Sequence, residues 1–230
     1  MTTIQVISLD MFQTLVSLDN RFISMWRQIL KDRYNESEAR TLQAKLIEQY
    51  YIVAMRMREN HQFVLTRDIY KECFDELLPS LGISYDCAEV VDVLIQEHRQ
   101  AELYEETLDF LDFILKNYRV CIVTDTDEDM LPRFFEAYRI PLFSSEKYRS
   151  YKNDHDNSMF QEIIKYYDIE PAGILHIGDT VSNVVGAQRA GIQACWINRH
   201  QEPWTLAKTP DYIIRNLNEI RNNINKTINC

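Results

Sequence analysis

The feature that most constrains the fold is a change in hydrophobic pattern that occurs twice along the chain. Residues 3–9 (TIQVISL) form a short β-branched run, which is typical of a buried strand. Between about residues 19 and 100, strand signals vanish and apolar residues recur at helical spacing. After residue 103, short apolar runs alternate with helical segments, as in the βαβ units of a parallel sheet. The helical block therefore interrupts a single α/β domain.

We predict an α/β fold with two parts. A Rossmann-like parallel sheet core with helices on both faces comprises residues 1–17 and 104–230, and an inserted helical cap comprises residues 18–103. The cap is expected to hold four helices, near 20–32, 36–58, 66–78 and 87–102. The core is expected to hold strands at 3–9, 119–124, 174–177, 192–197 and 212–215, and helices at 105–117, 127–138, 157–168 and 182–190. The Asn-rich tail, residues 222–230, is expected to fray.

Composition excludes several classes of protein. The net charge is −10 and no basic cluster is present, which argues against nucleic acid or an anionic membrane as a partner. No apolar run approaches the ~18 residues that span a bilayer, and the N-terminal residues lack the pattern of a signal peptide. The five cysteines are scattered, which fits reduced thiols. We therefore expect a cytoplasmic monomer or homodimer that binds a small molecule.

Polar side chains follow three of the predicted strands. Asp10 follows the first, Thr124 ends the second, and Gly178 and Asp179 follow the third, while Lys152 lies in a connecting loop. Ligands of an open parallel sheet bind beyond the carboxyl ends of its strands, so these groups are expected to converge. Carboxylate oxygens suit Mg²⁺, and a hydroxyl and an ammonium suit phosphate oxygens. The chain has only 5 glycines, and four of them fall between residues 173 and 191, around Asp179.

In this order and spacing, the groups resemble the four motifs of the haloacid dehalogenase-like hydrolase superfamily. The first motif is a strand ending in D-x-x-x-T-L, here residues 10–15. The second ends in Thr or Ser, here Thr124, and the third is a downstream lysine, here Lys152. The fourth is G-D followed by an acid or amide, here residues 178–179 and Asn183. The helical insertion is similar to the family's mobile cap.

The resemblance implies a mechanism. Asp10 would be a nucleophile that forms an aspartyl intermediate, which water then hydrolyses. Asp10 and Asp179, with the backbone carbonyl of Phe12, would hold Mg²⁺. Thr124 and Lys152 would bind the oxygens of the transferred group and stabilise the charge that develops on them.

Further residues are secondary candidates. Thr14 and Asp125 are expected to contact the substrate or support the metal ligands. The polar group of Asn183 would either support the metal ligands or only begin a helix. Arg21, on the first helix of the insertion, would face the substrate or, more commonly for such a residue, solvent or the core. His176 is expected to be a core histidine within a strand.

One position departs from the family pattern. Family phosphatases have a second Asp where this chain has Phe12, and that acid transfers protons worth about 10²–10⁴ in rate. Dehalogenases of the superfamily also have an aromatic residue there, but they lack an acid at the position of Asp179. The leading hypothesis is a Mg²⁺-dependent phosphatase acting on a small phosphorylated metabolite with a good leaving group, with Asp125 or Asp127 as substitute acid. The alternatives are a 2-haloacid dehalogenase and a non-catalytic binding module.

Overall fold

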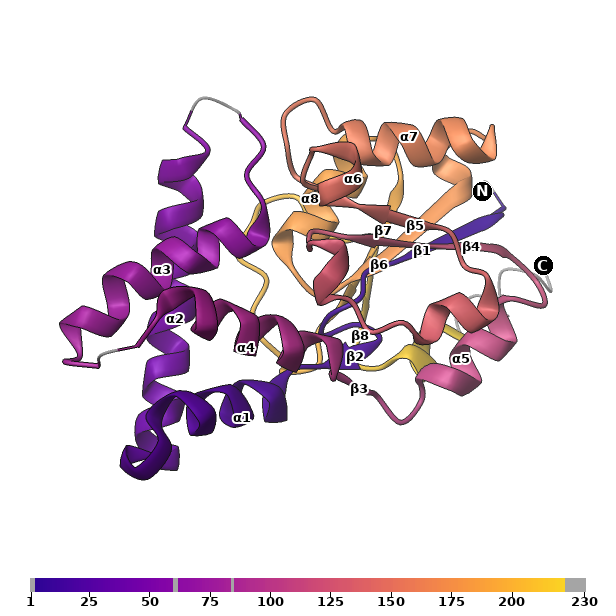
Figure 1. The fold of residues 1–230 in the computed structure, drawn as a ribbon. Coiled ribbons are helices and arrows are strands. Elements are labelled where there is room, and N and C mark those ends of the chain that lie inside the picture. The colour runs from indigo at the N-terminus through magenta and orange to yellow at the C-terminus, as the bar shows by residue number, and fades with distance from the viewer. Residues whose placement is uncertain (1–2, 60–61, 84, 222–230) are drawn as a thin grey trace. The chain divides into compact units, whose positions relative to one another are not determined.

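The computed structural model describes residues 3–59, 62–83 and 85–221, and it divides into two compact units (Figure 1). A sheet unit contains Met1–Ser17, Leu103–Asp125 and Phe135–Cys230, and a helical unit contains Leu18–Glu102 and Thr126–Phe134. The predicted boundaries differ in two respects, because they place residue 103 in the insertion and residues 126–134 in the core. The tail that was expected to fray lies outside the described residues.

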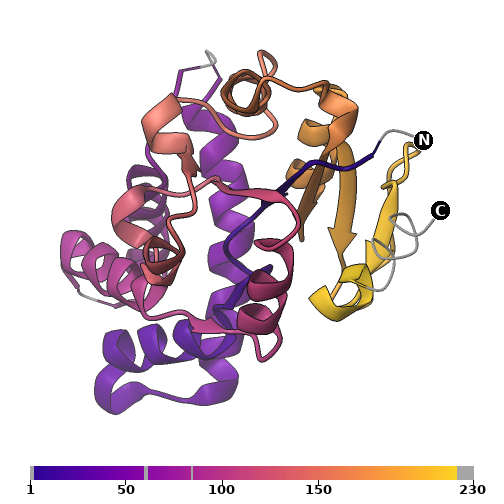
Figure 2. The same ribbon diagram turned by 90° about the vertical axis from the view of Figure 1, so that its right-hand side faces the viewer.

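The sheet unit is built on six parallel strands in the order β5-β4-β1-β6-β7-β8. Their bounds are β1 Val6–Leu9, β4 Arg119–Thr124, β5 Leu142–Ser144, β6 Ile174–Gly178, β7 Gln193–Ile197 and β8 Tyr212–Ile214. Figure 2 shows β8, in yellow, at one edge beside β7. The predicted parallel α/β core is confirmed. Every side chain of β1 and β6 is buried, as expected for central strands that helices cover on both faces.

Helices cover the sheet on both sides. The helices α7 (Ser158–Tyr167) and α8 (Val181–Arg189) contribute Met159, Phe160 and Val184 to a core that also contains side chains of β1, β4, β6 and β7. The short α6 (Ser145–Tyr148) follows β5 directly. The helix α5 (Thr107–Ile114) lies across the sheet from α7 (Figure 1) and buries Phe110, Leu111 and Ile114. Each such side chain contributes roughly 1.5–3 kcal/mol when it leaves water.

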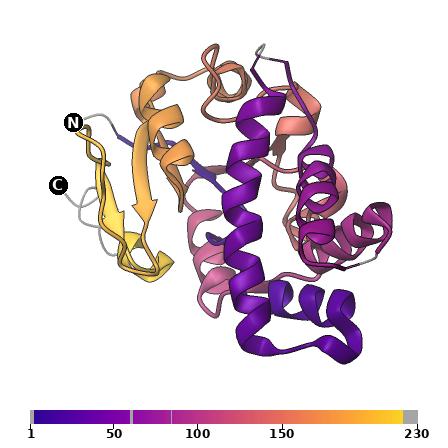
Figure 3. The same ribbon diagram turned by 90° about the vertical axis from the view of Figure 1, so that its left-hand side faces the viewer.

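Over its described residues, the helical unit contains four α-helices, which confirms the predicted helices of the insertion. They are α1 Asp19–Leu30, α2 Glu36–Met57, α3 Thr66–Ser80 and α4 Cys87–Arg99. The long α2, which crosses the view in Figure 3, packs against α1 and α3, and α4 packs against α3 and α1. Two polar side chains cap helices in the gaps between the predicted helical ranges: Asn35 accepts a hydrogen bond from Glu38 N, and Asp86 accepts one from Ala88 N.

Two predictions about local structure were wrong. The helix expected over 127–138 is two short 3₁₀ segments, Glu128–Met130 and Phe134–Tyr138. Pro132 lies between them, and a proline inside a helix removes a hydrogen bond and clashes with the preceding turn. The strand β5 was missed because three residues after a proline carry too little pattern to distinguish a strand from a loop.

Two short strands, β2 (Val16–Ser17) and β3 (Glu102–Leu103), pair with each other in a second sheet. They border the helical insertion in the sequence, because β2 precedes α1 and β3 follows α4. Within residues 3–59, 62–83 and 85–221, no helix combines the length and apolar character needed to cross a membrane.

Candidate active site

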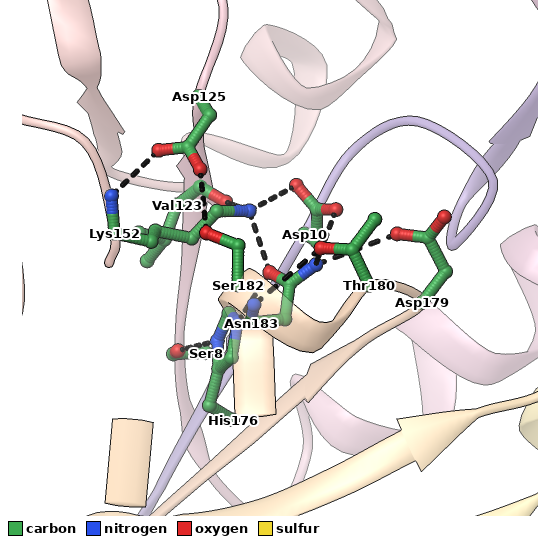
Figure 4. A network of polar contacts seen from close by, with 10 residues as sticks. All are labelled: Ser8, Asp10, Val123, Asp125, Lys152, His176, Asp179, Thr180, Ser182 and Asn183. Atoms are coloured by element: carbon green, nitrogen blue, oxygen red, sulfur yellow. Dashed lines mark hydrogen bonds and ion pairs between the residues drawn. The ribbon is translucent and has the colours of Figure 1, made fainter. Parts of the chain in front are cut away.

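The candidate site lies at the carboxyl edge of the sheet, where β1, β4 and β6 end (Figure 4). Leu9 is in register with Ile122 of β4 and Ile177 of β6, so the residues after these three strands emerge side by side. The backbone N–H of Asp10 donates to the carbonyl of Ile177 at 2.9 Å. Strand pairing therefore brings together groups that are more than a hundred residues apart in the sequence.

Asp10 and Lys152 form a buried ion pair. The Lys152 Nζ lies 2.7 Å from Asp10 Oδ1, and only 2% of the Lys152 surface is exposed. Burial alone would raise the pKa of Asp10, but the adjacent ammonium outweighs burial and lowers it. Burial would lower the pKa of Lys152, but the charges of Asp10 and Asp125 raise it. Both groups are therefore charged at neutral pH, and Asp10 is a carboxylate.

The side-chain amide of Asn183, at the start of α8, connects the charged groups. Its Oδ1 accepts a hydrogen bond from Lys152 Nζ at 2.5 Å, and its Nδ2 donates to Asp10 Oδ2 at 3.1 Å and to Asp179 Oδ1 at 3.4 Å. Asn183 is almost completely buried. Its backbone N–H donates to the hydroxyl of Thr180, the residue just before α8. Thr180 therefore caps α8, and the side chain of Asn183 contacts Asp10, Asp179 and Lys152.

Asp179 is the second carboxylate of the site. Burial first, and then the negative charge of Asp10, raise the pKa of Asp179 well above its ordinary value. One ammonium, from Lys152, faces three carboxylates, from Asp10, Asp125 and Asp179. The donor set of Asp10 and Asp179 fits Mg²⁺, which proteins commonly hold by one or two carboxylates and several waters. Among the described residues, no three His, Cys, Asp or Glu side chains form a metal-binding group.

Asp125 connects the end of β4 to the lysine loop and to α8. One carboxylate oxygen accepts the backbone N–H of Lys152 at 2.7 Å, and the other accepts the hydroxyl of Ser182 at 3.2 Å. Burial raises the pKa of Asp125, although the Lys152 charge opposes this. With both oxygens engaged, Asp125 holds the lysine loop against α8, which does not support its use as a substitute acid.

Asp127 lies elsewhere, in the helical unit. Its fully buried carboxylate accepts the backbone N–H groups of Thr66 and Arg67 at 2.9 and 2.8 Å, and the Arg67 guanidinium lies 3.1 Å away. It thereby caps α3, whose preceding residue, Leu65, provides no capping side chain. Its hydrogen bonds therefore stabilise the N-terminal end of α3.

The remaining predicted residues divide between the units. Thr124 ends β4 at the site, is 1% exposed and pairs with Ser144 of β5. Phe12 lies in the loop after Asp10 and forms a bridge with Val16. Arg21 lies in the helical unit, where its guanidinium pairs with two acids, Glu97 and Glu102. Both acids belong to the helical unit, so Arg21 forms ion pairs within that unit.

The end of β7 and the segment after it support both carboxylate loops. The indole N–H of Trp196 donates to the backbone carbonyl of Asp179 at 2.7 Å. The guanidinium of Arg199 donates to the carbonyls of Gln13 and Thr14 at 3.1 and 2.7 Å. Gln13 has a φ of +55°, a conformation that favours glycine, so these hydrogen bonds stabilise a strained turn just after Asp10.

The sequence pattern did not indicate a site role for Ser8, His176 or Ser182. Ser8 and His176 lie opposite each other on β1 and β6, and His176 reaches Asn183. The prediction that His176 is a buried strand residue is confirmed, but its contact with the site depends on strand register. The available signal was the presence of two polar residues within runs that are otherwise apolar.

The loop that carries Lys152 is held against α8. A Cβ at Gly186 would overlap the backbone carbonyl oxygen of Lys152, so only glycine permits this approach. The side chain of Asn157 donates to the Gly186 carbonyl at 2.9 Å, and Arg189 donates to the carbonyl of Asn153 at 3.2 Å. The depth of the lysine in the site therefore depends on a close contact between backbones.

Gly186→Ala should consequently destabilise the protein and displace Lys152. We expect the free energy of unfolding to fall by about 1–3 kcal/mol, because overpacking forces a backbone shift. Urea denaturation of the wild type and the variant measures the change. Gly173→Ala is the matched control, since a Cβ there would meet its nearest neighbour, Gln5, at an ordinary 3.4 Å. Equal stability of the two variants would contradict the inferred contact.

Comparisons with known proteins agree with this arrangement. Residues 4–191 match the haloacid dehalogenase-like hydrolase family. YfnB of Bacillus subtilis (strain 168), a protein named for the same hydrolase family, is 26% identical over 182 residues, which cover 72% of this chain and 74% of YfnB.

Solved structures share the fold. The magnesium-bound structure of YfnB has a TM-score of 0.81 at 17% identity, covering 97% of this chain and 100% of that one. The L-2-haloacid dehalogenase RSc1362 has a TM-score of 0.80 at 15% identity, over 97% and 100% of the two chains. The L-2-haloacid dehalogenase of Xanthobacter autotrophicus has a TM-score of 0.77 at 16% identity, over 97% and 99%. At these identities, the likeness is one of fold.

Proposed function

The chain belongs to the haloacid dehalogenase-like hydrolase family, and on that premise we propose that Asp10 is the nucleophile of a Mg²⁺-dependent phosphoryl hydrolase. The observation that carries the proposal is the buried ion pair between Asp10 and Lys152 at the carboxyl edge of the sheet. The carboxylate would attack phosphorus and displace the leaving group as its anion, forming an acyl phosphate that water then hydrolyses to phosphate and free Asp10. Lys152 would stabilise the charge on the transferred oxygens, with Thr124 at the end of β4 beside it.

The acid pair supports a divalent cation. Without one, the charges of Asp10 and Asp179 would repel a phosphate, and Lys152 alone leaves them only partly neutralised. Asp10 and Asp179, with the Phe12 carbonyl as a further ligand, would hold Mg²⁺, which when bound neutralises this charge and polarises a phosphoryl oxygen. The solved structure of YfnB, named for the same family, contains magnesium.

The leaving group defines the substrate class. Phe12 cannot donate a proton, and both oxygens of Asp125 are engaged by Lys152 and Ser182. The site therefore suits substrates whose leaving group departs as a stable anion, such as small acyl or aryl phosphates. We further propose that the four-helix insertion acts as the family's cap and selects among them.

A phosphate panel tests this function. We expect the purified protein to release phosphate from acetyl phosphate and p-nitrophenyl phosphate with Mg²⁺, and to stop when EDTA removes the metal. Alkyl monoesters should be turned over far more slowly, because their leaving oxygen needs a proton. Absence of turnover across the whole panel would overturn the phosphatase assignment, and binding of phosphates without turnover would favour a binding module.

A second candidate is hydrolysis of carbon–halogen bonds. Phe12 favours it, since a halide leaves without a proton, and several solved structures with this fold are L-2-haloacid dehalogenases. Asp179 argues against it, because an extra carboxylate would repel the carboxylate of a haloacid. Halide release from 2-chloropropionate in EDTA, with no release of phosphate from the panel, would establish this candidate over the first.

Phe12→Asp should restore proton transfer to the leaving group. We expect kcat/KM for an alkyl phosphate to rise by about 10²-fold, at the lower end of the usual contribution of a general acid, while acetyl phosphate is affected much less. Phe12→Leu is the matched control, since it removes the ring without adding an acid. Initial rates on both substrates measure the effect, and equal responses to the two substitutions would contradict it.

A further inference from the structure

Two buried polar side chains, Ser8 and His176, lie behind Asn183 on the side away from Asp10 (Figure 4). They are register partners on β1 and β6, and neither is exposed to solvent. Ser8 Oγ lies 2.5 Å from His176 Nδ1, and His176 Nε2 lies 2.8 Å from Asn183 Oδ1. Polar groups are costly inside a sheet unless they are hydrogen-bonded, and this chain of contacts ends at the nucleophile.

The surrounding groups determine where the protons lie. Lysine only donates, so the Asn183 atom that faces Lys152 is the oxygen, and the amide nitrogen faces Asp10. His176 Nε2 meets the same oxygen and must therefore carry a proton. His176 Nδ1 is then an acceptor for the hydroxyl of Ser8. Burial, the largest cause, lowers the pKa of His176 to about 4, which agrees with a neutral ring.

We propose that Ser8 and His176 are positioning residues that hold the Asn183 amide with its nitrogen toward Asp10. An anionic substrate would compete for the ammonium of Lys152, which otherwise orients the amide. The His176 Nε2–H would remain on Asn183 Oδ1 and prevent the amide from rotating. One carboxylate oxygen of Asp10 then stays bound by Asn183 while the other reacts.

The inference rests on Asp10 as the reacting group, as the proposed function has it, but the orientation is measurable without turnover. NMR spectra of protein with ¹⁵N-labelled histidine report which ring nitrogen is protonated, and His176→Gln identifies the resonances. We expect a neutral ring protonated at Nε2 between about pH 5.5 and 8. A ring protonated at Nδ1, or charged in this range, would overturn the proposal whether or not any substrate is found.

Turnover provides the second readout. His176→Phe preserves ring volume but removes both hydrogen bonds, and we expect kcat to fall by about 10–100-fold with KM changed by less than about threefold. His176→Gln retains a donor and an acceptor and should restore most of kcat. Ser8→Ala should lower kcat to a smaller degree, and Ser8→Thr should restore it. Thermal unfolding of each variant separates loss of orientation from loss of fold.

The outcomes are distinct. If His176→Phe matches the wild type, or if His176→Gln is as impaired as His176→Phe while folded, the two residues do not position Asn183. If His176→Phe does not fold, the comparison of Ser8→Ala with Ser8→Thr, together with His176→Gln, tests the positioning roles. If the wild type turns over none of the panel, the proposed function fails. In that case, the side-chain NH₂ resonance of Asn183 tests whether Ser8 and His176 position the amide. We expect this resonance to shift or broaden in Ser8→Ala but not in Ser8→Thr.

Discussion

Asp10→Asn is expected to abolish turnover, lowering kcat/KM by on the order of 10⁴-fold or more, as removal of a nucleophile does. The amide is similar in size but cannot attack phosphorus, so no covalent intermediate forms. Initial rates on acetyl phosphate measure the loss, and mass spectrometry of acid-quenched enzyme detects the phosphorylated wild-type peptide. Asp112→Asn is the matched control, since Asp112 is exposed on α5.

The same variant also affects stability. It leaves the buried ammonium of Lys152 without its carboxylate. We therefore expect the free energy of unfolding to fall by about 3–5 kcal/mol in metal-free buffer. The folded pKa of Asp10 is lowered, so its carboxylate contributes stability above the unfolded pKa of about 3.9, which is lost as pH falls through the folded value. The difference between wild type and variant should therefore shrink in acid. Turnover within tenfold of wild type, or a difference that grows in acid, would contradict the assignment.

Lys152→Met is expected to cause the second-largest loss. Methionine fills a similar volume but removes the cation that contacts Asp10 Oδ1 and Asn183 Oδ1. We expect kcat to fall by about 10²–10³-fold, because the charge of the transferred group loses its stabilising donor. The variant also buries Asp10 unpaired, which should cost about 3–5 kcal/mol of stability. Lys165→Met on the exposed side of α7 is the matched control.

The pH dependence of this variant has the opposite sign. The folded pKa of Lys152 is raised, so its contribution to stability is complete below the unfolded pKa of about 10.4 and is lost as pH rises through the folded value. Denaturation at neutral and strongly alkaline pH should show the difference between wild type and Lys152→Met shrinking in alkali. A pH-independent difference, or full activity of the variant, would contradict a charged lysine at the site.

Much of the fold could be predicted from the sequence because its patterns are local. The β-branched runs of β1 and β4 and the helical spacing of α2 are properties of neighbouring residues, so they indicate elements without any tertiary contact. The short β5 could not be predicted in this way, because a three-residue strand is defined by its pairing with β4. The capping of α3 by Asp127 could not be predicted from the sequence either, since this hydrogen bond joins segments about sixty residues apart.

The same distinction between local sequence patterns and tertiary contacts applies to the candidate site. The sequence by itself determined the residue types that follow β1, β4 and β6, because a strand's end and the next residue are neighbours in the chain. Only the tertiary structure decided that Asp125 is engaged by Lys152 and Ser182, and that Ser8 and His176 support Asn183. Such roles depend on strand register and on hydrogen bonds between distant segments, which arise only when the chain packs.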